Sequence, residues 1–184
     1  MAYWFDRLAL YVCSWYVTSQ PSQLILLRTA RLGDSEHDMA DRNFPCTVEV
    51  STLNGQLRHV FSGFRNWVND MYFFQNETGI VACDETGLTM VWDLVVGTCL
   101  YSFTFDFPVT SACISDDGLL AICSRQEDQV RVIQLSDSAS VSSVLFERPH
   151  KIRFISSISG RANDHVLVAR SRPPNGSKIF SLKW

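Results

Sequence analysis

The sequence lacks the residue patterns on which most metal sites and active sites are built. Its six cysteines are scattered and form no CxxC pair, the spacing that brings two thiolates within reach of one zinc ion. No P-loop and no G-x-G-x-x-G sequence follows a strand-like run, and none of the four histidines adjoins a G-x-S-x-G turn. We therefore predict no catalytic residue, no cofactor-binding residue, no cofactor and no metal ligand.

Two pairs of adjacent acidic residues are candidates for acid–base chemistry, Asp84 with Glu85 and Asp116 with Asp117. Both pairs stand in turn-like segments, where neighbouring side chains point apart and are normally solvated. We interpret them as turn residues and predict that the chain is not an enzyme.

The chain also has no excess of positive charge. A formal net charge of −3 leaves no broad basic surface of the kind that binds phosphate backbones, so there is no strong nucleic-acid signal. The only targeting candidate is the apolar run Leu8–Val17, whose ten residues are too few to cross a bilayer that needs roughly 20. No clear signal-peptide cleavage site follows this run. We predict a buried strand there and no membrane span.

Several cysteines stand inside apolar, strand-like runs. Cys83 follows Val81 and Ala82, and Cys123 follows Ile122. A reduced cysteine in such a run packs like a small hydrophobic residue. Because this usage is typical of a reducing compartment, we predict an intracellular location, in the cytoplasm or the nucleus.

Strand patterns dominate the chain. Short β-branched and aromatic runs such as Thr47–Val50 and Val130–Ile133 are bounded by Asn, Asp and Gly. No window of helical length keeps an apolar stripe with a period of 3.6 residues. The sequence therefore predicts an all-β fold.

The strands recur in a repeat. The triplets Ser51–Leu53, Trp92–Leu94 and Ile133–Leu135 each end a strand, at intervals of 41 residues. In the best copy, four short strands are predicted at 69–74, 79–83, 88–94 and 99–105. We predict one domain over 1–184, with approximate repeat units at 8–61, 66–105, 108–147 and 151–184, the last without a fourth strand.

Two segments carry a family resemblance. Gly87–Leu94 followed by Gly97–Leu100 has a turn glycine, a strand ending in Trp-Asp and a G-x-C-L return, and Asp116–Ala121 resembles the turn and second strand of the next copy. The chain thus resembles the WD-repeat β-propeller family, although the Trp-Asp pair occurs only once. The resemblance implies about four WD-repeat-like propeller blades of four antiparallel strands each. It leaves open whether the propeller closes by itself or is completed by another chain.

The resemblance implies a non-catalytic scaffold or adaptor that binds other proteins in a complex. Two connections between repeats supply the predicted protein-binding residues. These residues are Phe64, Arg65 and Trp67 in the first connection and Phe105, Asp106 and Phe107 in the second. The alternative for these aromatic residues is packing between blades. The alternatives for the chain are a fragment of a longer WD-repeat protein without independent function, and a propeller-type enzyme or ligand-binding protein.

Overall fold

The computed structural model describes residues 10–17, 24–31, 46–52, 54–75, 78–145, 149–155, 164–171 and 177–183. The chain divides into two compact units, Met1–Val68 and Asn69–Trp184. The predicted single domain over 1–184 therefore stays a prediction.

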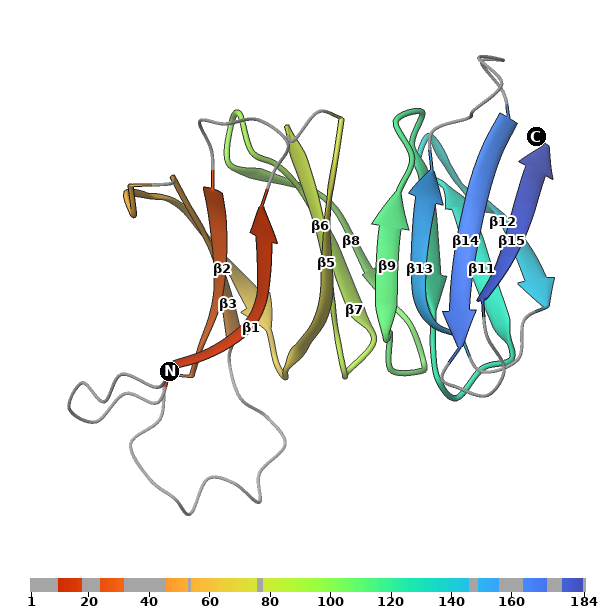
Figure 1. Ribbon diagram of the computed structural model, residues 1–184, viewed down its shortest axis with the longest axis horizontal. Helices are drawn as coiled ribbons and strands as arrows, with labels where there is room; N and C mark the ends of the chain where they lie inside the picture. Colours follow the sequence, from red (N-terminus) through yellow and green to blue (C-terminus); the bar gives the residue numbers. More distant parts are fainter. Residues whose placement is uncertain are drawn as a thin grey trace. The chain divides into compact units, whose positions relative to one another are not determined.

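The first unit contains one antiparallel sheet with the strand order β1-β2-β3-β4 (Figure 1). Its strands are β1 (Leu10–Val17), β2 (Leu24–Arg31), β3 (Cys46–Ser51) and β4 (Leu57–Phe64). Along β3 the buried side chains of Cys46, Val48 and Val50 alternate with more exposed ones, because successive side chains of a strand point to opposite faces.

The second unit contains three sheets of consecutive strands (Figure 1). The first has β5 (Val68–Phe74), β6 (Gly79–Asp84), β7 (Leu88–Asp93) and β8 (Thr98–Thr104). The second has β9 (Ser111–Ile114), β10 (Leu119–Cys123), β11 (Gln129–Gln134) and β12 (Asp137–Leu145). The third has β13 (Pro149–Ile155), β14 (Asp164–Ser171) and β15 (Ser177–Lys183). The predicted all-β class with four-stranded antiparallel sheets is confirmed.

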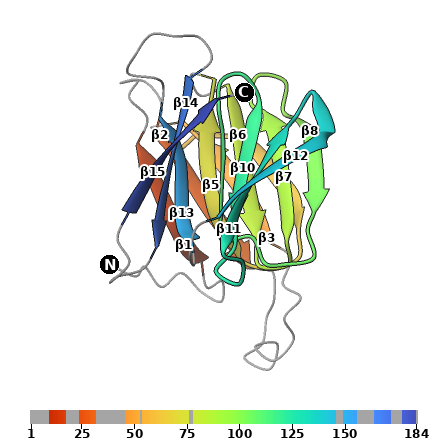
Figure 2. The same cartoon turned by 90° about the vertical axis from the view of Figure 1, so that its right-hand side faces the viewer.

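The three sheets of the second unit pack against one another in chain order, and Figure 2 shows their strands from a second side. Strand β9 contacts β6 on one side and β13 on the other. The middle sheet is therefore buried on both faces. Along β10, Leu120 and Ile122 join the apolar cluster shared with the β5–β8 sheet, while Leu119, Ala121 and Cys123 join the cluster shared with the β13–β15 sheet. A strand covered on both faces reads as a continuous apolar run.

The turn between β6 and β7 is closed by a buried carboxylate. Oδ1 of Asp84 accepts hydrogen bonds from the backbone N–H of Thr86 (2.8 Å) and Leu88 (3.0 Å) and from the Thr86 hydroxyl (2.7 Å). Gly87 follows with a φ of +90°, a conformation that a glycine adopts without strain. Asp84 is completely buried, so the prediction that it is solvated was wrong. The carboxylate is directed at the donors of the turn itself and not at solvent.

Candidate functional site

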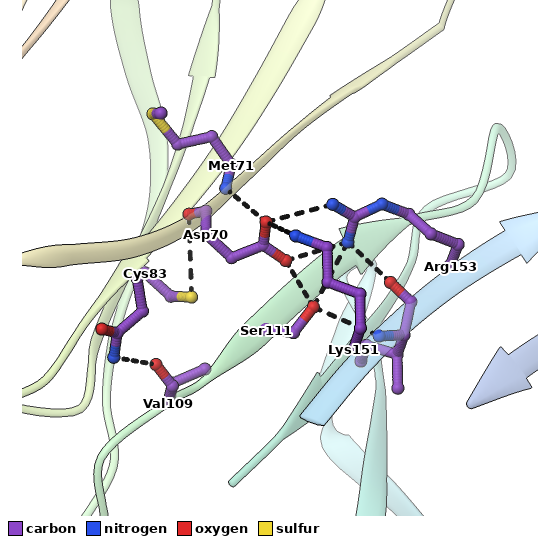
Figure 3. A network of polar contacts seen from close by, with 9 residues as sticks. Asp70, Met71, Cys83, Val109, Ser111, Lys151 and Arg153 are labelled. Carbon is purple, nitrogen blue, oxygen red and sulfur yellow. Dashed lines mark hydrogen bonds and ion pairs between the residues drawn. The ribbon is translucent and has the colours of Figure 1, made fainter. Parts of the chain in front are cut away.

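A buried carboxylate lies at the centre of a polar network that joins β5, β9 and β13 (Figure 3). Asp70, on β5, is 2% exposed. Its Oδ1 accepts a hydrogen bond from the backbone N–H of Met71 (2.9 Å), and its Oδ2 accepts one from the hydroxyl of Ser111 on β9. The first strands of two successive sheets are thereby joined through one side chain.

Two cations on β13 complete the surroundings of Asp70. Arg153 donates from Nη1 to Oδ2 (2.8 Å) and from Nη2 to Oδ1 (3.0 Å), and Lys151 donates to Oδ1. Burial alone would raise the pKa of Asp70. The hydrogen bonds and charges of Arg153 and Lys151 outweigh burial and hold this pKa below its ordinary value of 3.8. Asp70 is therefore an ionised, structural carboxylate.

Residues of this network are spaced at the interval of the sequence repeat. Asp70, Ser111 and Ile152 are 41 residues apart, and the backbone N–H of Ile152 donates to the Ser111 hydroxyl (3.2 Å). In the neighbouring position, Asn69 Nδ2 donates to the Val109 carbonyl (2.8 Å). The first strands of all three sheets in the second unit are thus tied at one end.

The thiols beside this network are unsuited to nucleophilic chemistry. Burial raises the pKa of Cys83 well above its ordinary value and the pKa of Cys123 to about 12. The sulfhydryl of Cys83 donates to the Asp70 carbonyl. Because only a thiolate is a good nucleophile, both residues act as small core side chains.

The predicted protein-binding residues fall in different environments. Phe64 is 2% exposed and Phe107 is 7% exposed, so both are core residues. Arg65, Trp67 and Asp106 are exposed, and Phe105 is partly buried against the core cluster that contains Phe107. Three of these residues belong to each compact unit. The contact surface that they were predicted to form stays a prediction.

Phe107 ends an aromatic ladder that begins on β8. Ring centroids are 6.2 Å apart between Tyr101 and Phe103, 6.3 Å between Phe103 and Phe105, and 5.5 Å between Phe105 and Phe107. The guanidinium of Arg131 lies 4.4 Å from the Phe107 ring centroid. The ladder fixes the outer strand β8 to the core between two sheets.

The outer end of this ladder belongs to an exposed apolar stretch that the sequence analysis did not single out. Val95 is 76% exposed, Val96 69%, Leu100 49% and Tyr101 38%, and we call these four residues the β8 apolar stretch. No charged residue occurs between Asp93 and Asp106. From the sequence, the residues of the β8 apolar stretch were interpreted only as part of the turn and return strand of a repeat. The sequence of an apolar strand does not show whether another sheet covers that strand.

The described residues contain no group of three His, Cys, Asp or Glu side chains placed to hold a metal ion. In the same part of the chain, no helix has the length and apolar character needed to cross a membrane.

Comparison with known proteins identifies the fold and not a family. No protein-family model matches the chain, and no curated protein matches it in sequence. Among solved structures, 733 chains match, which is expected of a widespread fold. One of them, a chain in the crystal structure of the mitotic checkpoint complex, is 12% identical with a TM-score of 0.63. The match covers 95% of this chain and 62% of that chain.

This likeness confirms the predicted fold class. The chain is an all-β protein with the fold of β-propeller blades, and each complete sheet has four antiparallel strands. The fold by itself assigns no partner or activity.

Proposed function

We propose that this chain is a non-catalytic protein–protein interaction scaffold, an adaptor subunit of a multiprotein complex, and a divergent member of the WD-repeat family. The observation that carries the function is the β8 apolar stretch. Single exposed apolar residues are common, but several exposed apolar residues in one segment without charge are typical of a protein interface. The similar solved chain comes from a multiprotein complex, which supports a comparable setting here.

Among the last strands of the four sheets in chain order, β8 differs from the other three in charge. Strand β4 contains Arg58, β12 begins with Asp137, and β15 contains Lys178 and Lys183. Charged residues on outer strands protect a sheet edge against unwanted pairing. Strand β8 has none, so its exposed face favours a partner that covers it.

The engaged acidic residues favour a scaffold over a propeller-type enzyme. Asp70 is held by two cations, and Asp84 closes a turn. Asp116 Oδ1 accepts a hydrogen bond from the backbone N–H of Gln75 (3.2 Å), and Asp117 accepts one from the Ser115 hydroxyl. A general acid or base must instead be available to a substrate.

An intracellular location belongs to the same proposal. Cys83 and Cys123 are buried and form no disulfide. Proteins of oxidising compartments commonly use their cysteines in disulfides.

The scaffold proposal is tested with a matched pair of double variants. Val96→Asp with Leu100→Asp places charge in the β8 apolar stretch, and Leu57→Asp with Val60→Asp places it on β4, where the two native residues are 52% and 51% exposed. Tagged full-length chains are expressed in cells, cross-linked and analysed by quantitative mass spectrometry, after circular dichroism has shown that each variant folds.

We expect the β8 variant to lose partners that the wild type and the β4 variant keep. Identical partners for all three proteins would exclude the β8 apolar stretch as the interface. Hydrolase turnover by the purified chain that disappears in Asp116→Asn would contradict the non-catalytic assignment.

A further inference from the structure

The turn between β3 and β4 contains an asparagine that is followed by a glycine, Asn54–Gly55. Both residues are exposed. Gly55 has a φ of +82°, and a Cβ on this residue would meet no heavy atom within 4 Å. Glycine has no side chain of its own to shield its backbone nitrogen, and the space beside this one is open. The Gly55 nitrogen is therefore not sterically shielded from the side-chain amide of Asn54.

An asparagine side chain reacts with the backbone nitrogen that follows it, which makes asparagine a thermolabile residue. The Gly55 N–H loses its proton to hydroxide, and the nitrogen forms a bond to Cγ of Asn54, which places the negative charge on Oδ1. The bond from Cγ to the amide nitrogen then breaks, and ammonia leaves. The product is a cyclic succinimide. Water opens this ring at either carbonyl and gives aspartate or isoaspartate, so the overall reaction consumes water and releases ammonia.

The structure places two donors on the atom that becomes negatively charged. The Thr52 hydroxyl donates to Oδ1 of Asn54, and the backbone N–H of Gln56 donates to the same oxygen (3.4 Å). The Gln56 N–H also donates to Oγ1 of Thr52 (3.1 Å), which holds the hydroxyl in the turn. Donors directed at an atom where charge develops stabilise the transition state more than the ground state. The turn itself therefore promotes attack on the Asn54 amide.

Two contacts of the same turn oppose the reaction. The Gly55 N–H donates to the Thr52 carbonyl (2.9 Å), and this hydrogen bond must open before the nitrogen attacks. Oγ1 of Thr52 also lies 3.3 Å from the Gln56 carbonyl oxygen, a second acceptor for the hydroxyl proton. Exposed hydrogen bonds at a turn open at low free-energy cost. These contacts therefore slow the reaction without preventing it.

Asn66 provides a comparison in the same compact unit. The residue after it is Trp67, whose large side chain stands beside the backbone nitrogen that would have to attack. The N–H of Trp67 donates to Oδ1 of Asn66 itself (2.7 Å). A reactive neighbour and an unreactive one are thus both present in the first unit, and the difference between them is the residue that follows the asparagine.

We propose that Asn54 is a modification site, at which spontaneous deamidation produces aspartate or isoaspartate and the Thr52 hydroxyl acts as a positioning group. The reaction adds a negative charge to the turn, close in sequence to Leu57, which is 52% exposed. Isoaspartate also lengthens the backbone between β3 and β4. The site uses none of the residues of the β8 apolar stretch, so it stands or falls separately from the scaffold interface.

The test follows each asparagine of the full chain during prolonged incubation, folded in buffer and unfolded in urea. Peptide mapping by tandem mass spectrometry detects the conversion of amide to acid, and enzymatic carboxyl methylation detects isoaspartate. It also separates Asn54 from the second Asn-Gly pair, Asn175–Gly176, which lies outside the described residues. We expect Asn54 to convert in the folded chain, faster at higher pH because its attacker must be deprotonated, while Asn66 stays intact.

Three variants test the role of the hydroxyl, after circular dichroism has shown that each folds. Thr52→Val should slow conversion of Asn54 about tenfold in the folded chain, the effect of losing one hydrogen bond, and should match the wild type in urea. Thr52→Ser keeps the hydroxyl and should convert like the wild type. Thr78→Val is the matched control, because it removes a hydroxyl from another turn, where it donates to the Gln75 carbonyl (2.8 Å).

Two results would overturn the proposal. The first is a folded wild type that keeps Asn54 intact over a period in which the unfolded chain is converted, because the turn would then protect the amide. The second is a folded Thr52→Val variant that converts as fast as the wild type or faster. The comparison of folded and unfolded wild type decides the first point whether or not Thr52→Val folds.

Discussion

The hydroxyl of Ser111 donates a hydrogen bond to the buried carboxylate of Asp70, a residue 41 positions earlier in the chain. The same interval separates Ile152 from Ser111, and Asp116 from Gln75, and each of these pairs is also hydrogen-bonded. The interval equals the spacing of the three triplets that revealed the repeat. The 41-residue repeat therefore also describes how the sheets pack, because equivalent positions of successive sheets contact one another.

Replacing the buried carboxylate should strongly destabilise the fold. Asp70→Asn removes the charge that balances Arg153 and Lys151, and breaking a buried ion pair from one side costs about 3 kcal/mol or more. The measurement is the free energy of unfolding in urea. Asp106→Asn, at an exposed aspartate, should change it by less than about 0.5 kcal/mol.

The difference in unfolding free energy between the wild type and Asp70→Asn should depend on pH. The pKa of Asp70 is lowered in the folded state, so its contribution is complete above the unfolded value near 3.8 and is lost as the pH falls through the lower folded value. The stability difference between the wild type and Asp70→Asn should stay constant near neutral pH and shrink below about pH 4. A difference that grows on acidification would contradict the ionised state of Asp70.

Gly87 should be far less tolerant of alanine than Gly55, although both have a positive φ. A Cβ on Gly87 would lie 2.4 Å from the carbonyl oxygen of Phe105 and 2.6 Å from that of Phe107, whereas a Cβ on Gly55 meets nothing within 4 Å. Gly55→Ala should cost about 1 kcal/mol from backbone strain alone, and Gly87→Ala roughly 3 kcal/mol. Thermal unfolding of the two variants measures the difference, and equal costs would disprove the close approach.

The aromatic ladder should be stabilising at its buried end only. Phe107→Ala opens a cavity in the core and removes the contact with Arg131, which should cost about 3 to 5 kcal/mol. Tyr101 is 38% exposed, and Tyr101→Ala should cost about 1 kcal/mol or less. Denaturant titration of both variants distinguishes this gradient from a ladder whose members contribute equally.

One threonine of β7 should be better replaced by valine. The Oγ1 atom of Thr89 is buried and has no hydrogen-bond partner among the described residues. Thr89→Val keeps the shape and removes an unsatisfied polar group, so it should stabilise the protein by about 1 kcal/mol. Thr86→Val is the control with the opposite expected effect. The Thr86 hydroxyl donates a hydrogen bond to Asp84, so its loss should destabilise the fold. A destabilising Thr89→Val would show that the hydroxyl is bonded.

The predicted strands agree well with the structure because their signals are local. The sequence predicts strands at 79–83 and 88–94, and β6 is found at Gly79–Asp84 and β7 at Leu88–Asp93. The Asp84 carboxylate was misjudged, because an aspartate in a solvated turn and one that closes a buried turn look alike in sequence. Asp70 was missed altogether. Its two cations lie 81 and 83 residues away, and nothing in the residues around it records them.

The sequence by itself determined the all-β class, the four-strand order of each complete repeat and the 41-residue interval, because alternation, turn residues and periodicity act between near neighbours. Only the tertiary structure decided which polar and apolar side chains are covered. Stacking of the sheets buries Asp70 with its cations and buries Phe107 at the end of the ladder, while it leaves Val96 and Leu100 exposed. Burial depends on which sheet packs against which face, and these contacts join residues that are distant in the chain.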